Sequence, residues 1–193
     1  MLISNVPHGY PSPKTRNIPA FMEKRAIAPK PPPIPIAGVY LYSNNITTNA
    51  GNAAEGHPDE VALANDSMNV ILPFTGTPPQ NGAPQFGDVF IKKAFDITSL
   101  RLMNLIANPN TKTFEIRYYN GVSTTPVYKV VLLNSFISSA RRAKADCQGS
   151  GCIGIQEIYS FNFISIEFHN LMVSPAQILT YNKATNITTW TNN

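Results

Sequence analysis

Residues 155–168 read IQEIYSFNFISIEF and predict the clearest strand of the chain, because β-branched and aromatic side chains favour strands. Successive side chains of a strand point to opposite faces. Two sets of apolar residues in this stretch have opposite parity, and the buried face changes near Asn162. A strand that changes its buried face is typical of a β-barrel or a bent sandwich. The two sets are Tyr159, Phe161 and Phe163, and Ile158, Ile164, Ile166 and Phe168.

The surrounding sequence predicts further strands and a single helix. Asn120-Gly121 indicates a hairpin between predicted strands at 113–119 and 127–136. The polar stretch 44–65 indicates a long excursion of the chain between two strands. Ser99 is placed to cap the helix, and Asn108-Pro109 ends it. The pattern is therefore all-β with one helix. The predicted strands are 36–43, 67–74, 86–95, 113–119 and 127–136, and the apolar face of the helix is Leu100, Leu102, Met103, Leu105 and Ile106.

The chain divides into three segments by composition. Residues 1–37 hold nine of the seventeen prolines and carry five basic residues against one acidic residue. This N-terminal arm is either flexible or an extended segment laid on a neighbour, because proline excludes a central strand or a long helix. Residues 38–170 form the predicted domain, and residues 171–193 form a predicted polar tail.

Charge is scarce outside the arm. Only 13% of the residues are charged, against about 25% in an ordinary globular protein, which favours a subunit that buries surface against neighbours. The net charge of +4 belongs to the arm, so the sequence predicts no nucleic-acid partner. The basic residues Arg141, Arg142 and Lys144 are interpreted as a solvated loop or an interface patch. The sequence contains no stretch of about 20 apolar residues, so we predict no membrane insertion. The N-terminal sequence lacks a signal-peptide core, so we expect the chain to fold in the cytoplasm.

The sequence motifs that resemble chemical sites lack their structural context. Residues 149–154 fit the pattern G-x-G-x-x-G, but a strand follows where a nucleotide site needs a helix, so they predict a flexible turn. Cys147 and Cys152 have no histidine nearby and make a poor zinc site; whether they form a disulfide stays open.

Two groups of carboxylates and one histidine complete the candidates. His57-Pro58-Asp59-Glu60 is interpreted as a solvated loop rather than a metal or acid–base site. Glu115, Glu157 and Glu167 lie on predicted strands, where exposed charges commonly protect sheet edges. We therefore predict no enzyme activity, no catalytic, cofactor-binding or metal-binding residue, and no cofactor.

Two segments resemble the haemolysin-coregulated protein (Hcp) family, the tube subunits of type VI secretion systems. SFNFISIEF at 160–168 resembles the last strand of that family, with Phe168 where the family usually has Trp. FIKKAFDITS at 90–99, followed by Leu102, resembles its junction between strand and helix, with Leu100 where the family has Pro. Residues 131–139 resemble the strand and Ser-rich loop before the last strand. The resemblance spans roughly residues 36–170, a length typical of one domain.

The resemblance implies a small β-barrel of two packed antiparallel sheets with one flanking α-helix. It also implies hexameric rings that stack into a tube, with a contractile sheath, a spike and secreted effectors as partners. Such a protein would be cytoplasmic before firing, then secreted to the extracellular space or target cell without a cleaved signal peptide. The alternatives are a phage-like tail-tube protein of another contractile device, or a secreted carbohydrate-binding β-sandwich. The last would use aromatic platforms at Tyr118, Tyr119, Tyr128 and Trp190.

Overall fold

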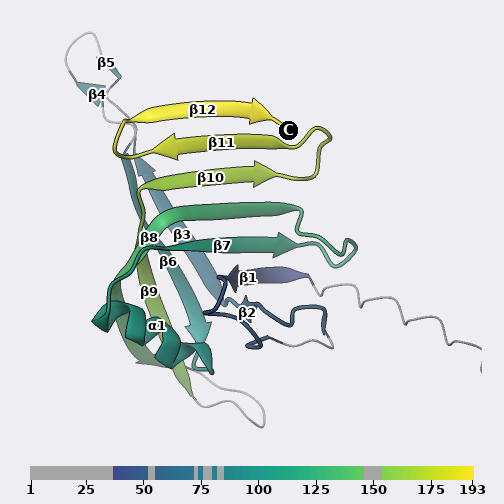
Figure 1. Ribbon diagram of the computed structural model, residues 1–193, viewed down its shortest axis with the longest axis vertical. Helices are drawn as coiled ribbons and strands as arrows, with labels where there is room; N and C mark the ends of the chain where they lie inside the picture. Colours follow the sequence, from purple (N-terminus) through teal and green to yellow (C-terminus); the bar gives the residue numbers. More distant parts are fainter. Residues whose placement is uncertain (1–36, 52–54, 72–73, 76–79, 82–84, 146–153) are drawn as a thin grey trace, which may run out of the picture. The chain divides into compact units, whose positions relative to one another are not determined.

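The computed structural model describes residues 37–51, 55–71, 74–75, 80–81, 85–145 and 154–193. All strand pairs in this part are antiparallel, and one helix accompanies them (Figure 1). The elements are β1 (Gly38–Tyr42), β2 (Val61–Ala62), β3 (Asn65–Ile71), β4 (Phe74–Thr75), β5 (Gln80–Asn81), β6 (Gln85–Ala94), α1 (Thr98–Ala107), β7 (Lys112–Tyr119), β8 (Tyr128–Lys144), β9 (Ile155–Asn162), β10 (Ser165–Asn170), β11 (Gln177–Asn182) and β12 (Ile187–Asn192).

Two sheets share the long strand β8. The large sheet has the order β12-β11-β10-β8-β7-β1-β2, and the small sheet joins β3, β6, β9 and the second half of β8. Residues 128–133 of β8 pair with β10, whereas residues 136–144 pair with β9. Between these halves Asn134 has a φ of 49°, in the left-handed region that asparagine tolerates better than most residues. β8 therefore bends out of one sheet and into the other. The hairpin β4–β5 forms a separate pair.

The predicted change of buried face at Asn162 is confirmed. β9 lies in the small sheet, and after Phe163 and Ile164 the chain continues as β10 in the large sheet. Phe161 and Phe163 are buried before the switch and Ile166 after it, while Ile164 between them is exposed. The segment thus supplies core residues to both sheets. Phe114 on β7 meets Phe161 on β9 with 4.6 Å between ring centroids, so the two sheets pack face to face. The predicted all-β fold with one helix is confirmed.

Helix α1 packs against β8 and matches the predicted location, but its cap and its face differ from the prediction. Ser99 is the second helical residue rather than the cap. The Asp96 carboxylate accepts the Thr98 N–H, and the Ser99 hydroxyl accepts the Asp96 N–H, a reciprocal arrangement like a capping box. Leu102 and Leu105 are buried as predicted, whereas Leu100 and Met103 face solvent.

Three further assignments are corrected. Residues 171–193 are not a tail, because β11 and β12 extend the large sheet beyond β10. Arg141, Arg142 and Lys144 lie on β8 rather than in a loop, and the serines at 138–139 belong to the same strand. Glu157 is not an exposed edge charge, because β9 is flanked by β6 and β8 and its carboxylate is buried. The arm up to residue 36, both cysteines and most of the glycine-rich segment lie outside the described residues.

Leu105→Ala tests the packing of α1. Leu105 is 8% exposed and belongs to the core, so the substitution is expected to lower the free energy of unfolding by about 2 to 5 kcal/mol. Leu100→Ala is the matched control, because Leu100 is 70% exposed and its loss is expected to change stability by less than about 0.5 kcal/mol. Chemical denaturation of both variants measures the difference. Equal destabilisation would contradict the placement of the helix.

Candidate assembly surfaces

A buried lysine ties helix α1 to the small sheet. Lys93 on β6 has no exposed surface, and its ammonium lies 3.0 Å from the Asp96 carboxylate and 3.3 Å from the Glu157 carboxylate. It also donates to the Ser99 hydroxyl at 3.1 Å and to the Ala94 carbonyl at 2.8 Å. A buried charge is tolerated only when it is paired and hydrogen-bonded. The partners come from β6, α1 and β9, and thus these elements hold one relative position.

Glu157 completes this network from β9. Its Oε1 accepts from Arg142 Nε at 2.9 Å, and its Oε2, the oxygen near Lys93, accepts from the Tyr159 hydroxyl at 3.0 Å. Burial alone would raise the pKa of Glu157, but hydrogen bonds from Ser99, Arg142 and Tyr159 and the charge of Lys93 outweigh it, so the pKa lies below its ordinary value. Glu157 is therefore an ionised structural anion. A carboxyl held ionised in this way is not poised to act as a general acid.

A second buried cluster fixes the excursion between β1 and β3, and the solvated loop predicted for 57–60 is wrong. His57 and Glu60 are 1% and 5% exposed. His57 Nδ1 lies 2.6 Å from Glu60 Oε2, while Glu60 Oε1 accepts from Arg117 at 2.8 Å and from the Tyr119 hydroxyl at 2.9 Å. The His57 ring stacks on Tyr40 at 3.6 Å. The described part of the excursion is thus packed onto β1 and β7.

Gly51 permits this close packing. A Cβ at Gly51 would lie 1.7 Å from the His57 carbonyl oxygen and 2.3 Å from the Glu60 carbonyl oxygen. Both obstacles are backbone atoms, which a small rotamer change cannot move. The Gly51 N–H in turn donates to the Pro58 carbonyl at 3.0 Å. His57 and Glu60 were visible in the sequence, but Arg117 and Tyr119, their partners on β7, lie about sixty residues away, and spacing alone gave no sign of them.

The outer face of the small sheet carries a polar cluster around Asp88. Its carboxylate accepts from Ser138 at 2.6 Å, Ser160 at 2.8 Å and Asn162 at 2.7 Å. Burial raises the pKa of Asp88, but these hydrogen bonds and the charge of Lys183 outweigh it and hold the pKa below its ordinary value. The cluster joins β6, β8 and β9 across the sheet and leaves the carboxylate fully engaged.

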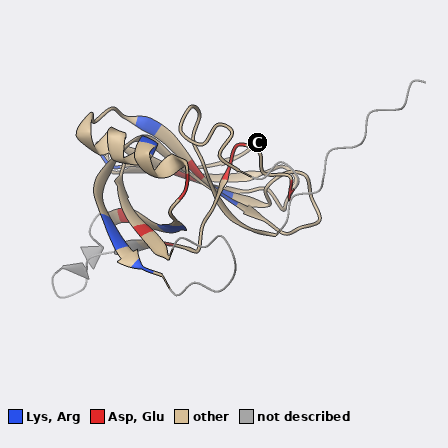
Figure 2. Ribbon diagram, turned by 90° about the horizontal axis from the view of Figure 1, so that it is seen from below, with Lys and Arg blue, Asp and Glu red and all other residues tan. Residues whose placement is uncertain are grey.

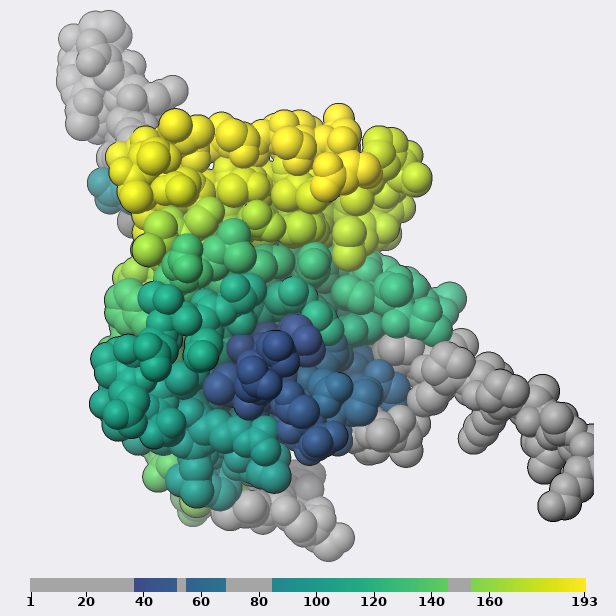
Figure 3. Space-filling model, in the orientation of Figure 1, coloured from purple at the N-terminus to yellow at the C-terminus, as the bar shows by residue number. Residues whose placement is uncertain are grey.

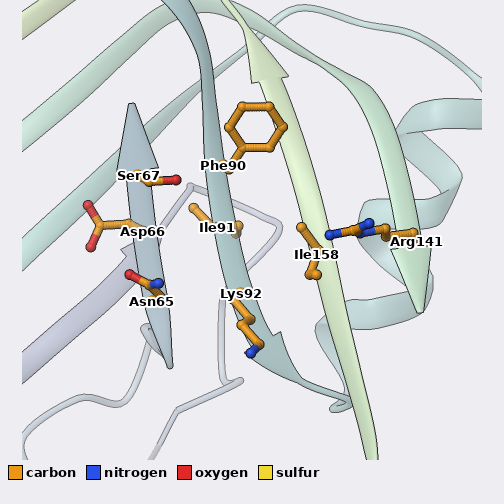
Figure 4. Close-up of a pocket in the computed structure, with 8 residues that line it drawn as sticks. All are labelled: Asn65, Asp66, Ser67, Phe90, Ile91, Lys92, Arg141 and Ile158. Atoms are coloured by element: carbon orange, nitrogen blue, oxygen red, sulfur yellow. The ribbon is translucent and has the colours of Figure 1, made fainter. Parts of the chain in front are cut away.

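Beside this cluster lies a shallow depression of about 330 Å³ over β3, β6, β9 and β8 (Figure 4). Lys92 and Arg141 flank Ile158 as cross-strand neighbours, and Phe90 borders the hollow. Among the described residues neither cation forms an ion pair. The Asp66 side chain points away from the hollow, and its carboxylate accepts the Tyr118 hydroxyl. This face therefore combines apolar area with two unpaired cations.

Large apolar side chains are exposed at several places. Figure 2 shows that Lys, Arg, Asp and Glu are sparse along the described ribbon. Seven of the eleven exposed large apolar residues of the described chain fall into three groups, and the other four lie in turns or between strands. The groups are Ile97, Leu100 and Met103 on and before α1, Phe90 and Phe136 on the small sheet, and Ile187 and Trp190 on β12. Where such residues form a contiguous patch, they are candidates for contacts with other proteins.

The part of the chain that the structure describes holds no group of three or more His, Cys, Asp or Glu side chains arranged to bind a metal. None of its helices has the length and apolar character to cross a membrane. Glu115 forms an ion pair with Arg117, and Glu167 lies 2.8 Å from His169 Nε2. Both carboxylates lie on inner strands, which corrects their predicted place at sheet edges.

The four aromatic residues considered as glycan platforms do not gather in one place. Tyr118 and Tyr128 face each other at 5.2 Å, whereas Tyr119 belongs to the His57 cluster. Trp190 lies on β12, several strands away from all three. The geometry therefore gives the carbohydrate-binding alternative no support.

Comparison with solved structures places the fold among Hcp proteins. Hcp1 from Salmonella typhimurium matches 80% of this chain and 99% of its own, with a TM-score of 0.63 and 10% identity. A type VI secretion system effector from Yersinia pestis matches 75% and 98%, with a TM-score of 0.58 and 12% identity. The secreted protein Hcp3 from Pseudomonas aeruginosa matches 81% and 98%, with a TM-score of 0.52 and 17% identity.

Sequence comparison adds no relative. No family model matches the chain, and no curated protein matches it. Identities of 10–17% show a shared fold and nothing finer. The resemblance predicted from residues 160–168 and 90–102 is confirmed at the level of the fold, which includes the β-barrel of two packed sheets and its flanking helix.

Lys93→Met tests the buried network. The substitution leaves Glu157 and Asp96 without their shared cation, and breaking a buried ion pair typically costs about 3 to 5 kcal/mol. We expect a loss of that size in the free energy of unfolding. Lys92→Met, the adjacent lysine on the outer face, is the control and is expected to cost less than about 0.5 kcal/mol. If Lys93→Met unfolds at the same denaturant concentration as Lys92→Met, the buried network does not stabilise the fold.

Gly51→Ala tests the packed excursion. The added methyl group meets two backbone carbonyl oxygens, so the excursion must move away from β1 and β7. We expect a loss of at least about 2 kcal/mol in unfolding free energy, at the upper end of ordinary substitutions. Hydrogen exchange at residues 57–62 should accelerate in the variant. Unchanged exchange there would show that the excursion is not held by this contact. Ala50→Ser, the adjacent position, serves as the control.

Proposed function

We propose that this chain is a structural subunit that forms hexameric rings, and that the rings stack into the inner tube of a type VI secretion machine. The observation that carries the proposal is the fold match, which spans nearly the whole length of the Hcp structures. A fold alone does not fix a function, so the surface must also fit an assembly role.

The described surface fits that role. A ring needs two different patches on each subunit that meet head to tail, and stacking needs two more. The exposed apolar residues lie on helix α1, on the small sheet and on β12, which are separate places on the subunit. The charged side chains near the core pair internally, as Lys93 does with Glu157 and Arg117 with Glu60. β12, which carries no charged side chain, can be buried without the large desolvation cost of charges.

The proposal extends to partners and location. A contractile sheath would surround the tube, a spike would tip it, and effectors would travel with it or within it. The protein would be made in the cytoplasm and propelled out of the cell with the tube. We propose no catalytic step for it, since the buried carboxylates Glu60 and Glu157 are each saturated by structural donors.

Particle size tests the proposal directly. We expect light scattering of the purified protein to give a mass near six times the 21.1 kDa of the chain, and negative-stain micrographs to show rings. A contact that holds such a ring should bury on the order of 1,000 Å² or more. A stable monomer at tens of micromolar, with no rings on the grids, would overturn the proposal. A ring-forming Hcp protein prepared in the same way provides the control.

A further inference from the structure

Strand β12 is an open edge of the large sheet. Within the described chain it pairs only with β11, and all six of its residues are exposed. The strand forms the upper rim of the face seen in Figure 3. Its sequence, ITTWTN, contains no proline, no lysine and no other charged residue. Natural edge strands are normally protected by such residues, by bulges or by a cover, because an open edge templates pairing with another chain.

The hydrogen-bonding pattern shows which backbone groups of β12 are free. The Asn193 N–H donates to the Ala176 carbonyl at 2.8 Å, which makes this a hydrogen-bonded pair. Bonded pairs alternate along an antiparallel ladder, and the register continues through Thr191↔Ile178 and Thr189↔Thr180. Thr189 and Thr191 therefore bond to β11. Thr188, Trp190 and Asn192 direct their N–H and C=O groups to the open side.

The side chains on this rim are also uncovered. Trp190 pairs with Leu179 across the strands, and Leu179 pairs with Phe168. The three side chains therefore lie on the same face of the large sheet as the core residues. Phe86 of the small sheet still covers this face at Tyr181, with 4.2 Å between ring centroids. Further out Trp190 is 58% exposed. A partner strand at β12 would therefore satisfy backbone groups and bury an apolar side chain at once.

The other described edges differ in how well they suit β12. β2 has only two residues. The free edge of β8 at 138–144 carries Arg141, Arg142 and Lys144, and β12 offers no acidic group to meet them. β3 has seven residues, NDSMNVI, and pairs only with β6 among the described strands. It has one acidic residue, Asp66, and a bulge between Met68 and Val70, but no proline and no basic residue. The proline-rich arm is a poor strand, because nine of its residues lack an N–H donor.

We infer that β12 of one copy adds as a strand to the free edge of β3 in a second copy of this chain. β12 and β3 are different surfaces, so the contact is head to tail and can repeat around a ring. The inference rests on the proposed function, since it assigns the ring contact to named strands. Main-chain hydrogen bonds would supply affinity, and Trp190 would supply the apolar anchor.

Proline substitutions test the edge without touching the core. Thr188→Pro removes an N–H that faces the open side, a position where edge strands tolerate proline, so the subunit should stay folded. We expect its melting temperature to change by less than about 3 °C and its ring population to fall at least tenfold in mass photometry. Asn192→Pro blocks the same side and should act alike. Thr189→Pro is the matched control: it removes a bond to β11 and should lower the melting temperature.

The outcomes separate the inference from the proposed function. Rings that form equally well with Thr188→Pro and Asn192→Pro overturn the role of β12 while the proposed function stands. A wild-type protein that forms no rings overturns both. Hydrogen exchange then tests the partner strand, using wild-type rings and the dissociated Thr188→Pro subunit. Slower exchange in the rings at both 187–192 and 65–71 supports the β12–β3 contact. Protection at 187–192 alone overturns the assignment to β3.

Discussion

The fold depends on β8 belonging to two sheets at once. Its first half pairs with β7 and β10, and its second half pairs with β9. A strand can do this only if it bends, and the bend is local: Asn134 takes a positive φ, and the register shifts between Ile137 and Ser139. The β9–β10 segment makes the same transfer through Phe163 and Ile164. These two transfers join the large and the small sheet into one barrel wall around the core.

Two clusters of paired charged side chains hold neighbouring elements together inside the subunit. Lys93 and Glu157 join β6 to β9 beneath α1, and Glu60 and Arg117 join the excursion to β7. Desolvating these groups costs free energy, which the multiple short hydrogen bonds of each cluster offset. What they add is specificity, because a shifted register would leave a buried charge unpaired. In a barrel rich in threonine and asparagine, whose strands could slip, that constraint selects one alignment.

The sequence predicted what depends on local pattern and missed what depends on distant partners. The parity change at Asn162, the β7–β8 hairpin and helix α1 all follow from spacing within about fifteen residues. Glu157 looked like an exposed edge charge because its partners Lys93 and Arg142 meet it only after β6, β8 and β9 pair. His57 looked solvated for the same reason. The residues after 170 seemed a tail because threonine and asparagine alternate there without a buried face, yet β12 needs only backbone pairing to join the sheet.

The exposure of β12 also bears on how the subunit meets other chains. A strand whose side chains are all exposed gains little from burial, so its stability rests on hydrogen bonds to a single neighbour. Such strands ordinarily fray or are covered. β12 carries the one tryptophan of the chain at its rim, where it remains largely uncovered within the described subunit. β12 itself carries no charged side chain, so little electrostatic repulsion opposes a second copy at this rim. The paired charges lie inside the barrel and none lies on β12, which leaves this edge open to association.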